Sequence, residues 1–206
     1  MNLGDLQEAI QRLDSQPAIV DERSITYLAT YPSLALFGSS IVVPVSREAF
    51  NQICAMTYGW MPRILRMREA DVQGALQVLN MAKQATIATC ASVRIDALGN
   101  CLHSLVGASK VLHFANDEVF PIWDSNIECF RVGEDPLQNH MSKIGNYFDY
   151  MKEVHAIRAN PEFPRFFAEY NTARRKRLAA LGIAYYPISP IRAIESAAFE
   201  LAPSRP

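Results

Sequence analysis

The chain lacks the motifs that mark several large functional classes. Its four cysteines (54, 90, 101 and 129) form no C-x-x-C pair, so their spacing predicts neither a zinc ribbon nor an iron–sulfur cluster. Histidine pairs with metal-ligand spacing, a Walker loop, a dinucleotide-binding fingerprint and a G-x-S-x-G elbow are also missing. We therefore expect no metal and no cofactor, and free buried thiols in a reducing compartment.

Long hydrophobic runs and strong net charge are also lacking. No apolar run approaches the roughly 20 residues that a transmembrane helix needs, and the first 16 residues are amphipathic and acidic. We therefore expect a cytoplasmic protein with no membrane partner. The net charge of −1 gives little overall attraction to a polyanion. Residues 143–177 are an exception, because they hold eight lysines and arginines against four acidic residues.

What is present is an ordinary globular composition. Half of the 206 residues are hydrophobic and 20% are charged, which argues against disorder. A chain of this length hides about 70% of the surface that it exposes when unfolded. We expect one domain over residues 1–206, or two helical lobes with a cleft near 58–63 and 109–126. Nothing in the sequence indicates an oligomeric state.

Periodic patterns predict an all-α, mainly helical fold. Apolar residues repeat at helical spacing over 3–13, 70–90 and 102–114, and further helices are expected over 46–57, 125–131, 137–159, 161–181 and 190–201. Ser46 and Asp124 are predicted N-caps, because each carries a short side-chain oxygen directly before a predicted helix. Residues 33–45 are apolar in two runs split by Gly38, which predicts at most a short extended or strand segment.

The stretch from Ser109 to Asp124 is the strongest candidate for chemistry. On a helix, Lys110 and His113 share a face, and Pro121 forces the chain out of that helix before Asp124. A lysine, a histidine and a carboxylate at adjoining helix ends can form an acid–base or nucleophile site. The structural alternative makes Asp124 an N-cap, Lys110 a surface amine and His113 a buried packing residue.

The sequence around Lys110 and Asp124 resembles that of a known protein family. LVGASKVLHFANDEVFPIWDSNI is similar to the segment that helix-hairpin-helix DNA glycosylases of the 8-oxoguanine type build around their catalytic pair. Lys110 matches the family's lysine and Asp124 its aspartate, after the apolar lead-in FPIW. TYGWMPRILR at 57–66 also resembles bacterial proteins with this fold. Two features of this sequence differ from the family pattern. Gly107 is the only glycine of a hairpin that usually has two, and the lysine and the aspartate of the family lie farther apart in sequence than Lys110 and Asp124. No four-cysteine cluster follows, which excludes the iron–sulfur branch.

The resemblance implies a helix-hairpin-helix glycosylase that flips a modified base out of DNA and cleaves its N-glycosidic bond. Asp124 would stabilise the positive charge that develops on the sugar and orient the nucleophile. Lys110 would be a candidate Schiff-base nucleophile if burial lowers its pKa. The base itself is not specified; a modified base in foreign DNA, as in defence against phage, is one hypothesis.

Further residues are candidates for binding. Those predicted to contact the substrate, the aromatic ones by stacking on an extruded base, are Tyr58, Trp60, Arg63, Trp123, His113 and Asn126. An aromatic corner packed against the core is the alternative at the Tyr-Gly-Trp turn. Those predicted to contact the DNA backbone are Ser109, Arg174, Arg175, Lys176 and Arg177. A run of cations is more often a solvated surface.

Two other functions are consistent with the same residues. A nucleoside or nucleotide N-glycosylase would use the carboxylate without a basic DNA track, and the near-neutral net charge favours it. A non-catalytic helical interaction module would use 109–124 only as a capped helical turn. A cleft open at Asp124 and flanked by Arg174 to Arg177 would support DNA, a closed pocket would support a nucleoside, and a buried, fully hydrogen-bonded Asp124 would support the module.

Overall fold

The computed structural model describes residues 1–15, 21–61 and 63–202, and every regular element in these ranges is helical. The α-helices are α1 (Leu3–Ser15), α2 (Glu22–Ser40), α3 (Arg47–Trp60), α4 (Val72–Gln84), α5 (Ile95–Cys101), α6 (Leu105–Ala115), α7 (Ser125–Val132), α8 (Gln138–Met141), α9 (Ile144–Arg158), α10 (Phe163–Ala180) and α11 (Pro190–Leu201). Two 3-10 turns are η1 (Glu69–Asp71) and η2 (Cys90–Ser92). None of these helices is long and apolar enough to cross a bilayer.

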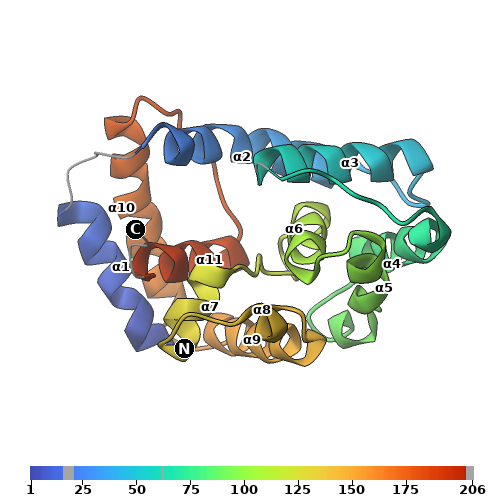
Figure 1. Ribbon diagram of the computed structural model, residues 1–206. Helices are drawn as coiled ribbons and strands as arrows, with labels where there is room; N and C mark the ends of the chain where they lie inside the picture. Colours follow the sequence, from blue (N-terminus) through green and yellow to red (C-terminus); the bar gives the residue numbers. More distant parts are fainter. Residues whose placement is uncertain (16–20, 62, 203–206) are drawn as a thin grey trace.

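Helix α6 lies in the middle of the molecule. Figure 1 shows it between α2 and α3 on one side and α7, α8 and α9 on the other. It packs against α2, α3, α4 and α5, while α11 packs against α1, α7, α9 and α10. Buried side chains from both groups form one continuous hydrophobic core. From Gly107 to Ala115, Lys110 is the single residue of α6 that is not buried.

The capping signals predicted two helix starts correctly. The Ser46 side chain accepts a hydrogen bond from the Ala49 N–H and begins α3. The Asp124 side chain accepts hydrogen bonds from the N–H groups of Asn126 and Ile127 and begins α7. Both caps satisfy backbone donors that the first helical turn leaves without an intrahelical partner.

The short extended or strand segment predicted near 33–45 is wrong for residues 33–40, which continue α2, and only 41–46 lie outside a helix. Tyr31, Leu34 and Gly38 are the buried positions of α2, at helical spacing. Gly38 lies where α2 crosses α6, and it does not interrupt the helix. A Cβ atom added there would lie 1.8 Å from the Phe114 carbonyl oxygen on α6, so only glycine permits this approach.

Two other predicted helices are interrupted. The helix over 70–90 ends at Gln84, and the Thr86 N–H then donates to the Thr89 hydroxyl at 2.9 Å. Threonine side chains compete with the helical ladder in this way. The helix over 137–159 is divided into α8 and α9, and α5 is a helix that the periodic patterns did not predict.

We expect Gly38→Ala to destabilise the protein by about 1–3 kcal/mol, because the new methyl group must displace the α6 backbone. The measurement is the free energy of unfolding by urea denaturation. Gly145→Ala in α9 is the matched control, since nothing lies within 4 Å of a methyl group added there. Equal stability of the two variants would show that α2 and α6 do not cross this closely.

Candidate active site

Lys110 and Asp124 lie next to each other, as the sequence predicted. The Lys110 Nζ atom is 3.7 Å from the Asp124 Oδ2 atom. Their side chains keep 13% and 20% of their surface exposed, so both are largely but not fully buried. Lys110 comes from the middle of α6, and Asp124 comes from the residue before α7.

The two oxygens of Asp124 have different tasks. Oδ1 accepts the N–H groups of Asn126 and Ile127, each at 3.0 Å, while Oδ2 faces Lys110. One oxygen therefore fixes the orientation of the carboxylate, and the other points toward the lysine. The N-terminus of α7 adds its dipole to the stabilisation of the negative charge.

Lys110 is held between a carboxylate and an aromatic ring. Its Nζ atom lies over the Trp60 ring, 5.5 Å from the centroid. Burial lowers the pKa of Lys110; the Asp124 carboxylate opposes this shift, and the Arg192 and Arg63 guanidinium groups reinforce it. A lysine whose pKa is lowered holds more of the neutral amine at pH 7, which is the nucleophilic form.

The chain that leads to Asp124 is held residue by residue. We call residues 117–123 the clamped segment, because side chains of surrounding helices bond successive backbone groups along it. The bonds are Ser189 to the Asp117 carbonyl, Arg158 to Glu118, His155 to Val119, His113 to Phe120 and Tyr147 to Pro121, with Glu195 accepting the Ile122 N–H and Ser109 accepting the Trp123 N–H. Residues 119–123 of this segment are buried, and a buried non-helical backbone needs such partners because water cannot supply them.

Glu195 lies between the clamped segment and helix α6. Its Oε2 accepts the Ile122 N–H, two residues before Asp124, and its Oε1 bonds Arg192 at 2.8 Å. The same Oε1 lies 3.5 Å from the Nε2 atom of His113, one turn along α6 from Lys110. Burial raises the pKa of Glu195, and the Arg192 guanidinium opposes this shift. Glu195 therefore ties α11 to the clamped segment through its hydrogen bond to Ile122, with His113 of α6 packed beside it.

His113 is neutral and structural. Its Nδ1 atom lies 2.9 Å from the Phe120 carbonyl, which can only accept, so Nδ1 carries the proton. Its Nε2 atom then accepts from the Tyr31 hydroxyl at 2.8 Å. Burial and the nearby Arg192 guanidinium lower the pKa of His113 well below its usual value. The prediction that His113 contacts the substrate is therefore corrected, because the ring is fully buried and both nitrogens are used.

Three other predicted contacts are corrected by burial. Trp123 has no exposed surface, and its indole N–H donates to Glu128 at 2.9 Å, so it offers no face to a base. Ser109 is also fully buried and bonds the Trp123 backbone, not DNA. Tyr58 is a core residue whose hydroxyl donates to the Leu102 carbonyl.

Trp60, Arg63 and Asn126 have side chains that are not buried. Trp60 adjoins Lys110, and Arg63 is close enough to influence the pKa of Lys110. Asn126 contributes its backbone N–H to Asp124. Their roles in substrate binding stay predictions. Position 62, inside the predicted cleft at 58–63, lies outside the described residues.

The run at 174–177 does not form one basic track. Arg174 is buried, donates to the Tyr186 carbonyl at 2.8 Å and lies over the Tyr186 ring, which corrects its assignment to the DNA backbone. Arg175 lies over the Tyr185 ring, and Lys176 pairs with Asp14 at 2.9 Å. Arg177 lies on the same helix, α10, and is partly buried.

Glu195 and Arg192 are the site residues that sequence reasoning missed. A signal was present, because Glu195 follows Ile191 by four positions and precedes Ala198 by three, on the apolar face of α11. A charged residue at a core-facing position is rarely buried unless it is paired.

Neither a metal centre nor a known relative accounts for this arrangement. Within residues 1–15, 21–61 and 63–202, no three histidine, cysteine or acidic residues form a group that could hold a metal ion. Comparisons with protein families, curated proteins and solved structures found no match to this chain.

The buried neutral His113 predicts acid sensitivity. Its pKa is lowered on folding, so its contribution to stability is complete above about pH 6.5 and is lost as the pH falls below that value, where the unfolded state takes up the proton. We expect His113→Asn to flatten the fall in unfolding free energy between pH 7 and pH 5, measured by urea denaturation. Asparagine can still donate to the Phe120 carbonyl. His155→Asn is the comparison at a half-buried histidine whose pKa is also lowered by burial, and an unchanged slope in His113→Asn would contradict a neutral His113.

Proposed function

We propose that this protein is an N-glycosylase that removes a base from DNA, with Asp124 and Lys110 as its catalytic residues. The observation that carries the proposal is the partly exposed lysine–carboxylate pair, 3.7 Å apart, at the end of a rigidly held segment. Two groups this close can act on the same sugar carbon. The resemblance around Lys110 and Asp124 supports the choice of a base attached to DNA.

The chemistry follows from the charges. Cleavage of the bond between C1′ and the base leaves positive charge on the sugar, which the Asp124 carboxylate stabilises. The bonding electron pair departs with the base. In the lysine route, the Lys110 lone pair forms a bond to C1′; the amine then gives one proton to the departing base and one to O4′ as the sugar ring opens to an imine. In the water route, a water oxygen attacks C1′ and its proton passes through Asp124 to the base.

A nucleoside N-glycosylase is the second candidate. Three of the cations at 174–177 are already engaged, Arg174 by Tyr186, Arg175 by Tyr185 and Lys176 by Asp14. This placement favours a small substrate over a long duplex. Free nucleosides therefore belong in the same assay as single-stranded and double-stranded DNA.

We expect Asp124→Asn to lower the rate of base release at least about a hundredfold, because the neutral amide cannot stabilise the sugar cation. Asparagine is as good an N-cap as aspartate, so α7 should still form. The measurement is base release from modified and unmodified DNA and from nucleosides. Asp96→Asn, which removes an exposed carboxylate elsewhere, is the control. Unchanged release in Asp124→Asn would refute this mechanism, whereas absence of release by the wild-type protein would favour a non-catalytic helical module.

An experiment on Lys110 distinguishes a water nucleophile from an amine nucleophile. We expect borohydride to trap a covalent protein–DNA adduct at pH 7, because burial lowers the pKa of Lys110 and leaves more neutral amine. Lys110→Gln should abolish trapping. If wild-type protein releases the base but forms no adduct, the water route operates and Lys110 only binds or orients the substrate.

A further inference from the structure

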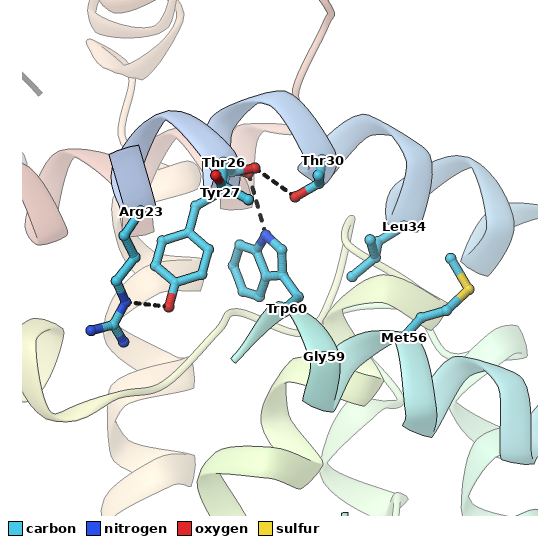
Figure 2. Close-up of a pocket in the computed structure, with 8 residues that line it drawn as sticks. All are labelled: Arg23, Thr26, Tyr27, Thr30, Leu34, Met56, Gly59 and Trp60. Carbon is cyan, nitrogen blue, oxygen red and sulfur yellow. Dashed lines mark hydrogen bonds between the residues drawn. The ribbon is translucent and has the colours of Figure 1, made fainter. Parts of the chain in front are cut away.

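A groove between α2 and α3 includes Trp60, the aromatic residue that also contacts Lys110. It has a volume of about 450 Å³, and its lining includes Arg23, Tyr27, Leu34, Met56, Gly59 and Trp60. Figure 2 shows Tyr27 and Trp60 side by side in it, Arg23 at one end and Met56 at the other. The groove is mainly apolar and aromatic, which suits a flat ring.

Two aromatic rings in the groove are fixed in position. The centroids of Tyr27 and Trp60 are 5.3 Å apart, with the rings tilted by 58°. The Trp60 indole N–H donates to the Tyr27 carbonyl at 3.3 Å, and the Phe114 ring meets the indole edge-on from the core. Aromatic surfaces that are held rigid bind a base by stacking, at little entropic cost and with little sequence preference.

The polar groups of the groove indicate the rest of the ligand. The Thr26 and Thr30 hydroxyls donate to helix carbonyls, so their protons are already used. The Arg23 Nε atom donates to the Tyr27 hydroxyl at 2.7 Å, and its terminal nitrogens extend away from the ring (Figure 2). A guanidinium held in this way favours an anion such as a phosphate. The ligand chemistry is therefore a flat base with a phosphate attached.

Trp60 is shared by the groove and the catalytic pair. The Lys110 Nζ atom lies 5.5 Å from the centre of the indole ring. We propose that the groove binds one nucleobase of the substrate strand, stacked on Trp60 and Tyr27, with Arg23 on the phosphate of that nucleotide. This inference rests on the proposed function and adds the place where the strand is held.

The chain offers a direct readout of this site. It contains two tryptophans, and Trp123 is fully buried whereas Trp60 lines the groove. Quenching of tryptophan fluorescence therefore reports on Trp60. We would titrate Asp124→Asn protein, which cannot turn over, with a short single-stranded DNA oligonucleotide and, separately, with a nucleoside monophosphate. We expect saturable quenching by both, tighter for the oligonucleotide, because it makes more phosphate contacts.

Two variants test the groove itself. Gly59→Leu fills it, since nothing lies within 4 Å of a Cβ atom added at Gly59, and should weaken binding at least about tenfold. Gly145→Leu, at an equally open glycine in α9, is the matched control. Arg23→Gln should weaken binding and reduce its salt dependence. Because Arg23 is on the surface, that variant should fold normally.

The outcomes separate the two proposals. Binding that is unchanged in Gly59→Leu and Arg23→Gln, or an absence of quenching, would overturn the groove proposal even if Asp124→Asn abolishes base release. Loss of binding in both groove variants would support the groove even if no variant releases a base. In that second case the glycosylase proposal alone would fail.

Discussion

The structure of the candidate site depends on one constraint, the clamped segment at 117–123. This stretch does not form a helix and is buried from Val119 to Trp123, so the buried backbone groups have neither helical partners nor water. Side chains of α6, α9 and α11 bond it instead, and Ser189 bonds it just before α11 begins. These bonds restrict the motion of the side chains that form them and of the backbone that precedes Asp124. The position of the carboxylate follows from the clamp.

Burial acts on the surrounding charges in different ways. It keeps His113 neutral, so the imidazole serves as a spacer with one donor and one acceptor. It lowers the pKa of Lys110 and so raises the fraction of the neutral amine, the form that can attack carbon. Arg192 lies over the Tyr31 ring and bonds Glu195, so this buried cation has both an aromatic face and a carboxylate. A single environment thus orders the polar groups and lowers the pKa of the lysine.

Local sequence signals predicted the elements whose causes are local. Ser46 and Asp124 cap helices through bonds that span two or three residues, and the apolar face of α11 repeats within one helix. The prediction failed at 33–45 because Gly38 has a distant cause, the backbone of α6 at Phe114. Gly107 is similar: a Cβ atom there would lie 2.4 Å from the Tyr58 hydroxyl, so packing between helices requires the glycine.

The sequence by itself determined the helical class, the caps and the proximity of Lys110 to Asp124, because a helix and a proline-containing turn link these residues within 15 positions. Only the tertiary structure decided which neighbours face the pair. Trp123 adjoins Asp124 in the chain yet is buried, while Trp60 and Arg192 come from far away and lie near Lys110. Adjacency in sequence does not determine exposure; the packing of α6 against helices distant in the chain does.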